Sequence, residues 1–158
     1  MSKTNFVLST WKKAGQIPGG KWLLSKYIAR KAPYFTSVNP ELLELRENYC
    51  KILIKKRKAI ENHIGTVHVI AICNELEMAM GVLAEASVPN HLRWIPKGME
   101  VDYTAKAGSD ITGVATVNAE DWKPGDLYVK IQAFDTSGVV VVDGRIKLWI
   151  SEKPPAKK

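Results

Sequence analysis

Residues 62–81, NHIGTVHVIAICNELEMAMG, decide how this chain folds. The stretch begins with polar residues and glycine and continues from Val67 as an almost wholly apolar segment. Three groups in it are disfavoured in an apolar environment, namely His68, Asn74 and Glu77. A helix that is apolar on all sides is normally buried on all sides, and a carboxylate there needs a partner or a function. The sequence therefore predicts a buried central helix that the rest of the chain covers.

Length and composition predict one globular domain. The chain has 158 residues, of which 46% are hydrophobic and 25% charged, enough for a real core. We expect a single domain over 1–152, with a helical extension at 1–32 and a flexible basic tail at 153–158. Two cysteines are too few for a disulfide framework, which favours a reducing, cytoplasmic location. The scattered His and Cys residues have no metal-ligand spacing, so neither a metal nor a cofactor is expected.

The net charge of +7 indicates attraction to a polyanion such as nucleic acid, anionic lipid or a phosphate-bearing ligand. The densest basic cluster, 55–58, would alternate between the two faces of a strand and has no interleaved aromatic residues, so we expect no nucleic-acid partner. The basic residues within 21–31 are interpreted as a solvated helix face. The apolar stretch is interrupted by Asn74, Glu75 and Glu77, which argues against a membrane span, and Glu75 is interpreted as a surface or interface residue.

The order of the elements predicts an α+β fold. Two short helices come first, the former capped by Ser2 or Thr4 and the latter over about 21–31. After the central helix, four strand-like segments follow, and residues 135–138 have the composition of a hairpin turn. One long helix can cover one face of a six-stranded antiparallel sheet, but this helix is too apolar to leave its other side in water. The sheet must therefore wrap around it, or a second copy must cover it. The predicted strands are 34–38, 49–58, 92–107, 111–119, 127–135 and 139–151.

Four residues and this order of elements resemble the hotdog-fold acyl-CoA thioesterases, and within them the phenylacetate-degradation thioesterases and a neighbouring branch of uncharacterised function. The family signature is an Asn, a Gly three residues later, a His-Gly-Gly three residues after that, and a carboxylate nine residues after the His. Asn62, Gly65, His68 and Glu77 have these spacings. The resemblance covers about 33–150 and implies a hotdog fold, a sheet wrapped around one long central helix.

Two residues depart from that signature. Val69 and Ile70 replace the two glycines that follow the histidine. The resemblance assigns the oxyanion to the backbone N–H after the histidine, and Val69 retains that N–H. A β-branched residue does not readily adopt positive φ and brings bulk close to a thioester. The departure therefore favours an alternative function, a non-catalytic hotdog dimer that binds acyl-CoA or a fatty-acyl ligand.

The resemblance implies hydrolysis of an acyl- or aryl-CoA thioester, with coenzyme A as part of the substrate. The Val69 amide would stabilise the oxyanion, and Glu77 would act as general base or nucleophile. Asn62 would position the carbonyl group or a water, and His68 would hold the entry loop. On the residues alone, Asn62 could instead be a turn cap and His68 a core histidine with satisfied hydrogen bonds.

Five more residues are assigned to binding. His63, Gly65 and Asn74 are predicted to contact the substrate, and Arg93 and Lys97 to contact the phosphates of coenzyme A. Asn74 could instead link elements through hydrogen bonds, and exposed Arg and Lys side chains are often only solvated.

The spacing of His68 and Glu77 also predicts an assembly. Nine helical residues rotate by ~900°, which is half a turn beyond two full turns, so the two side chains lie on opposite sides of the helix. They can share one site only if two copies place their helices side by side. The resemblance likewise implies a site at a dimer interface, in a homodimer or a homotetramer.

Overall fold

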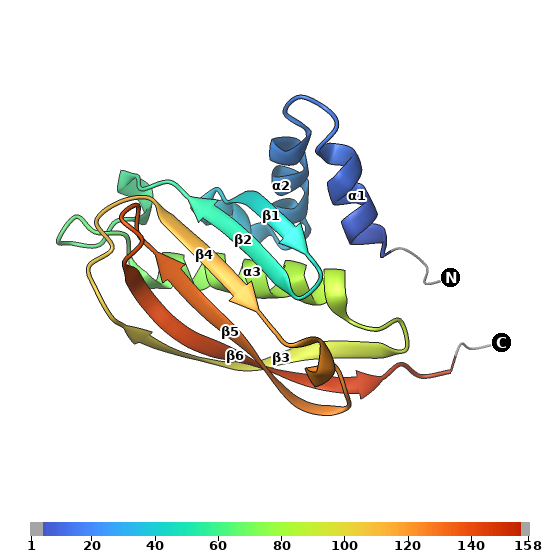
Figure 1. The fold of residues 1–158 in the computed structure, drawn as a ribbon. Coiled ribbons are helices and arrows are strands. Elements are labelled where there is room, and N and C mark those ends of the chain that lie inside the picture. The colour runs from blue at the N-terminus through green and yellow to red at the C-terminus, as the bar shows by residue number, and fades with distance from the viewer. Residues whose placement is uncertain (1–4, 156–158) are drawn as a thin grey trace.

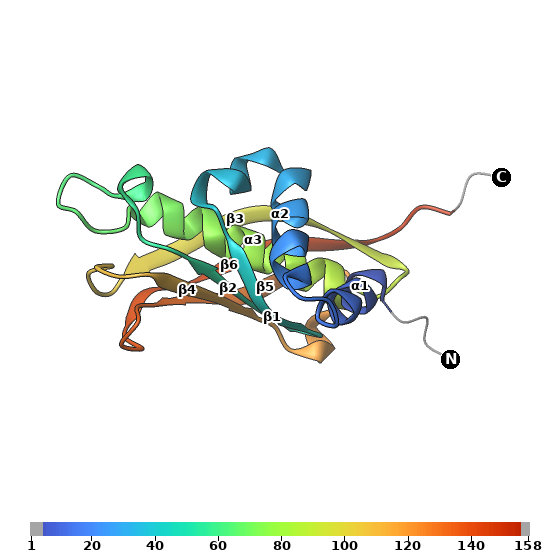
Figure 2. The ribbon, with the colours of Figure 1, turned by 90° about the horizontal axis from the view of Figure 1, so that it is seen from above.

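The computed structural model describes residues 5–155, which form one curved sheet around a central helix (Figure 1). The central helix, α3, lies against the concave side of the sheet, and a pair of shorter helices stands over one end of the molecule (Figures 1 and 2). The elements in chain order are α1 (Phe6–Ala14), α2 (Gly20–Lys31), the 3-10 helix η1 (Pro33–Val38), β1 (Glu41–Arg46), β2 (Tyr49–Ile54), η2 (Lys58–Ile60), α3 (Val69–Ser87), β3 (Leu92–Tyr103), β4 (Ile111–Thr116), η3 (Ala119–Asp121), β5 (Gly125–Phe134) and β6 (Val140–Glu152).

The sheet has six antiparallel strands in the order β1-β2-β4-β5-β6-β3. Burial alternates along β4 and β5, as expected for a sheet with one face on the core and the other in water. The buried side packs against α3, which also contacts η1 and accepts at Glu85 a hydrogen bond of 3.0 Å from the Trp94 Nε1 of β3. The predicted six-stranded sheet around one long helix is therefore confirmed.

The first strand lies later in the chain than predicted. Residues 34–38 form the 3-10 helix η1, with Pro33 at its first position, so the strand predicted there is wrong. The true first strand is β1, and its register shifts between Leu42 and Glu44. This irregularity interrupts the alternation of apolar and polar residues by which a strand is recognised in a sequence.

The other predicted elements are present with shorter or shifted ends. The strand predicted at 49–58 ends at Ile54, and the strand predicted at 92–107 ends at Tyr103. The hairpin turn at 135–138 is confirmed, because it joins β5 to β6 and Gly138 has a φ of +81°. The Asp135 Oδ1 accepts hydrogen bonds from the amides of Ser137 at 2.8 Å and Val139 at 2.9 Å.

The predicted N-terminal helices are present as α1 and α2. Asn5 caps α1, because its Oδ1 accepts from the amides of Val7 at 2.8 Å and Leu8 at 3.3 Å. The predicted caps, Ser2 and Thr4, lie outside the described residues. Helix α2 packs on η1 and β1, and α1 packs on α2 and α3, so the extension covers the β1 side of the domain (Figure 2).

Candidate active site

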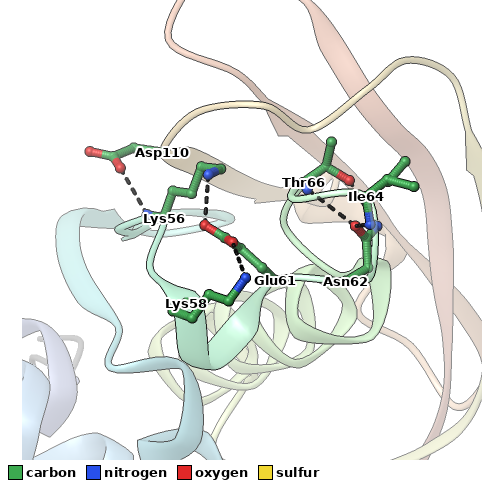
Figure 3. A network of polar contacts seen from close by, with 7 residues as sticks. All are labelled: Lys56, Lys58, Glu61, Asn62, Ile64, Thr66 and Asp110. Carbon is green, nitrogen blue, oxygen red and sulfur yellow. Dashed lines mark hydrogen bonds and ion pairs between the residues drawn. The ribbon is translucent and has the colours of Figure 1, made fainter.

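The loop before α3 is held by the side chain of Asn62 (Figure 3). Its Oδ1 accepts from the amides of Ile64 and Thr66, both at 3.1 Å, and its Nδ2 donates to the Thr66 Oγ1 at 2.8 Å. Gly65 completes the turn with a φ of +77°, a conformation that L side chains rarely adopt. The structure thus gives Asn62 the role of a turn cap, and its role toward a substrate carbonyl or water stays a prediction.

Ion pairs anchor the chain that leads into this loop (Figure 3). The Lys56 Nζ lies 2.7 Å from the Glu61 Oε1, and the Lys58 Nζ lies 3.7 Å from the Glu61 Oε2. The hydrogen bond from Lys56 is the largest cause that lowers the pKa of the Glu61 carboxyl. The Lys56 amide donates to the Asp110 Oδ1 at 2.8 Å. These contacts fix residues 56–61, which lead into the loop before α3.

His68 caps the N-terminus of α3. Its Nδ1 accepts from the Ile70 amide at 3.1 Å, and its backbone carbonyl accepts from Ala71 at 2.9 Å. Its own amide donates to the Ile60 carbonyl at 2.8 Å, which ties the loop to η2. The side chain is exposed, so the alternative of a core histidine is wrong.

One backbone N–H at the start of α3 has no hydrogen-bond acceptor within residues 5–155. Within residues 5–155, no atom accepts a hydrogen bond from the Val69 N–H, whereas the next amides of the helix are bonded to His68. Val69 does not have positive φ, because Asn39 and Asn48 are the non-glycine residues that do in this range. The expected backbone strain at Val69 is therefore wrong. A free N–H at the positive end of a long helix can bind a developing negative charge.

Val69 borders a pocket of about 350 Å³. Asn62, His63 and His68 line the same pocket, which reaches the end of β3 at Tyr103. The structure thus brings four of the predicted site residues together. Gly65 does not line the pocket but shapes the loop that carries His63.

Glu77 lies in a different pocket. It is exposed on α3 and borders a space of about 410 Å³ with Asn74 and with Pro96, Gly98 and Met99 of β3. Neither Val69 nor His68 lines this pocket. Within one chain, the structure therefore does not bring Glu77 to the predicted oxyanion donor, as the count around the helix indicated.

Asn74 links α3 to η1. Its Nδ2 donates to the Tyr34 carbonyl at 3.2 Å and to the Ser37 Oγ at 3.3 Å, while its buried Oδ1 has no partner within the described residues. Tyr34 borders the Glu77 pocket and a second hollow beside His68, and sequence analysis did not assign it to the site. It was missed because residues 34–38 were interpreted as a strand of the sheet.

Burial raises the pKa of two groups near the site. Burial raises the pKa of the Cys73 thiol, and the negative charge of Glu77 raises it further. Glu75 is fully buried, so its assignment to the surface is wrong. Its Oε1 accepts from the Gly113 amide at 2.8 Å, and its burial raises the pKa of the carboxyl well above the usual value. A signal existed, because position 75 shares the sheet-facing side of α3 with Ile72 and Ala79.

The two residues assigned to coenzyme A are both exposed on β3. The Arg93 Nε donates to the Ser151 Oγ at 3.0 Å. Lys97 lies where the pairing of β3 with β6 shifts, between Pro96 and Gly98, which border the Glu77 pocket. Lys97 is thus the nearer of the two to that pocket along the chain, and contact of either with a phosphate stays a prediction.

Solved structures with the same fold define the class of protein. The chain is similar to the protein named "genomics APC5556", with a TM-score of 0.80 and 37% identity over 93% of this chain and 98% of that one. A Pseudomonas aeruginosa protein described as a probable thioesterase has a TM-score of 0.75 and 20% identity, over 83% of this chain and 95% of that one. A thioesterase of Haemophilus influenzae has a TM-score of 0.67 and 10% identity, over 79% of this chain and 87% of that one. The predicted hotdog fold is confirmed.

The family is given by the sequence match. The family model described as a domain of unknown function (DUF4442) matches residues 20–150. This match spans most of the chain, and the chain therefore belongs to that family. No curated protein sequence matches it.

Residues 5–155 lack two kinds of feature. No helix there has the length and apolar character needed to cross a membrane. That part of the chain also holds no group of three or more His, Cys, Asp or Glu side chains placed to bind a metal ion.

Proposed function

We propose that this protein hydrolyses acyl-coenzyme A thioesters at a site shared by two subunits. One observation carries the proposal: among residues 5–155 the Val69 amide has no acceptor, and Glu77 lies in a separate pocket beside the edge strand β3. An unused donor and an unpaired carboxylate are the two groups that thioester hydrolysis needs. The thioesterases among proteins of the same fold support this chemistry.

The edge of β3 is where the second subunit would bind. Eleven of the twelve residues of β3 pair with β6 on one side, and no strand within residues 5–155 pairs with the other side. A long, unpaired edge strand readily pairs with another chain. Antiparallel pairing of two β3 strands about a two-fold axis would extend the sheet and cover the half-exposed side of α3.

The same pairing would join the two pockets. The Val69 pocket reaches Tyr103 at one end of β3, and the Glu77 pocket is bordered by Gly98. These two residues are ~17 Å apart along an extended strand. A register that sets Tyr103 opposite the partner's Gly98 would place the Val69 amide of one subunit and Glu77 of the partner subunit in one cavity.

The reaction then proceeds by addition and elimination. Glu77 takes a proton from a water molecule while the oxygen of that water attacks the carbonyl carbon of the thioester. The carbonyl oxygen becomes negatively charged and accepts from the Val69 N–H, which the helix dipole reinforces. The C–S bond breaks, and the leaving thiolate takes up the proton to give free coenzyme A and the carboxylic acid. Apolar residues around Glu77, including Met99 and Ile146, would hold the acyl group.

The proposal is tested by hydrolysis of a panel of acyl- and aryl-CoA substrates, with the released thiol as the readout. We expect Glu77→Gln to lower kcat by ~10²-fold or more, because the amide cannot accept the proton from water. Glu120→Gln is the matched control, since Glu120 is exposed in η3, outside the residues that border either pocket. It should hydrolyse the substrates at the wild-type rate.

Two results would contradict the proposal. One is equal turnover by the wild type and Glu77→Gln, which would remove Glu77 from the chemistry. The other is saturable binding of acyl-CoA by the wild type without release of thiol, which would make the protein a non-catalytic acyl-CoA-binding dimer.

A further inference from the structure

The net charge of this protein comes from its first 40 residues. Residues 1–40 hold seven of the 23 basic residues and no Asp or Glu. The remaining 16 basic residues are balanced by the 16 acidic ones, all of which lie in 41–158. The basic cluster at 55–58 is also partly neutralised, since Lys55 pairs with Glu41 at 3.6 Å and both Lys56 and Lys58 pair with Glu61. The attraction to a polyanion is therefore located in the N-terminal helices.

These helices also expose large apolar side chains. On α2, Trp22 is 52% exposed, Leu23 61% and Tyr27 58%. Ile17, in the turn between α1 and α2, is 62% exposed. The opposite side of α2 is buried on the domain through Ser25 and Ala29. Helix α2 therefore already has a buried side on the domain, and its exposed apolar residues lie on the side that faces away from it.

Aromatic and basic side chains share the outward side of α2. At ~100° per residue, six residues fall within about half of the helix circumference, and we call them the α2 outer face. Two cation–aromatic contacts lie within this face. The Lys26 Nζ is 5.5 Å from the centre of the Trp22 ring, and the Lys31 Nζ is 5.0 Å from the centre of the Tyr27 ring. No basic residue of this face is ion-paired to an acidic side chain within residues 5–155. The α2 outer face consists of Trp22, Leu23, Lys26, Tyr27, Arg30 and Lys31.

We propose that the α2 outer face docks on a membrane surface that contains anionic lipids. Trp and Tyr favour the boundary between water and lipid, where the ring meets the acyl chains and the polar atom meets the headgroups. Lysine and arginine beside them bind anionic headgroups electrostatically. The exposed Leu23 and Ile17 can enter the acyl region. The protein would lie on the lipid surface through this face, with or without thioesterase activity.

Charge argues against the other occupants of this face. A two-fold contact between two copies of the α2 outer face would bring cations together with no acidic residue to oppose them. A nucleic acid would satisfy the charge but would leave the exposed aliphatic side chains without a partner. The position of the face fits as well, because α2 packs on β1, whereas the unpaired β3 is the other edge of the sheet (Figure 1).

The test is cosedimentation of the full chain with lipid vesicles. We expect binding to phosphatidylcholine vesicles that contain about 30% phosphatidylglycerol, little binding to phosphatidylcholine alone, and weakening as salt rises. The charge variant Arg30→Glu/Lys31→Glu should bind the anionic vesicles at least tenfold more weakly, because two attractive contacts become repulsive. The apolar variant Leu23→Ser/Tyr27→Ser should also bind more weakly at unchanged charge.

The matched control is Lys123→Glu/Lys130→Glu. It makes the same change of net charge at exposed residues outside the N-terminal helices, and we expect it to bind nearly as well as the wild type. Circular dichroism establishes that each variant is folded.

Four results would overturn the proposal. They are no binding to anionic vesicles, equal loss in the control, tighter binding to single-stranded nucleic acid than to vesicles, or a change of sedimentation coefficient in the α2 variants. The last result would assign the face to contact between copies of the chain.

Discussion

Val69 shows that the donor at this site belongs to a backbone position rather than to a side chain. The family signature has a glycine there, and valine was expected to be strained if the position required positive φ. In the structure it is the first residue of α3 after the cap His68, where helical φ suits valine as well as glycine. The N–H is free because the first amides of a helix have no carbonyl behind them. The departure from the family signature therefore leaves the proposed oxyanion donor in place.

Glu75 predicts how stability depends on pH. A carboxyl with a pKa raised by burial is protonated in the folded chain and ionises near its usual pKa in the unfolded chain. Below ~4.3 both states are protonated, and its contribution to stability is fully present. As pH rises from there toward the raised pKa, the free energy of unfolding falls by up to about 1.4 kcal/mol per pH unit from this group.

Replacement of that carboxyl isolates its effect. Glu75→Gln keeps an oxygen for the Gly113 amide and cannot ionise, so we expect it to reduce the fall in stability as pH rises above ~4.3. Chemical denaturation at several pH values measures the slope, with Glu120→Gln as the exposed control. An unchanged slope in Glu75→Gln would show that Glu75 ionises equally in both states.

At the scale of elements, β3 decides what can be joined to this domain. It is a sheet edge along its whole length, and it borders both halves of the candidate site. Its register shift at Pro96 and Gly98 lies beside the Glu77 pocket. The same residues therefore shape both the β3 edge and the Glu77 pocket.

Amide hydrogen exchange tests whether β3 is paired on both sides. In a monomer, every second amide of β3 donates a hydrogen bond to β6 and is protected from exchange. The amides between them face solvent and exchange quickly. In the proposed dimer, both sets are protected. We expect slow exchange at alternate positions from Gly98 to Tyr103 at high protein concentration, and faster exchange there on dilution. Fast exchange at every concentration would contradict pairing through β3.

At the scale of the whole molecule, the composite site can be tested by mixing two inactive variants. Val69→Pro removes the proposed donor at a helix position where proline is tolerated, after a His68 with φ −64° and ψ 132° that suits a following proline. We expect it to lower kcat ~10²- to 10³-fold, whereas Val69→Ala, which keeps the N–H, should remain active.

A mixed dimer of Val69→Pro and Glu77→Gln holds one site with both native groups. Exchange of subunits between the two inactive variants should therefore restore about a quarter of the wild-type activity, since half of the dimers are mixed and each has one good site. Restoration requires that the two groups come from different chains. If mixing restores nothing while size-exclusion chromatography shows that subunits exchange, the site lies within one chain.

The sequence by itself determined the central helix, the four strands after it and the opposite directions of His68 and Glu77. These follow from periodicity and residue spacing, which are local properties of the chain. The free Val69 amide was also within reach, because a polar cap before an apolar run marks a helix start.

Only the tertiary structure decided the rest. It moved the first strand from 34–38 to β1, because a register shift conceals the alternation. It placed Glu75 in the core, because Gly113 on β4 leaves room for that side chain and donates to it. It paired the cluster at 55–58 with acidic residues and left the cations of α2 without them. Each outcome depends on which distant residues meet across the fold, and spacing along one chain does not contain that information.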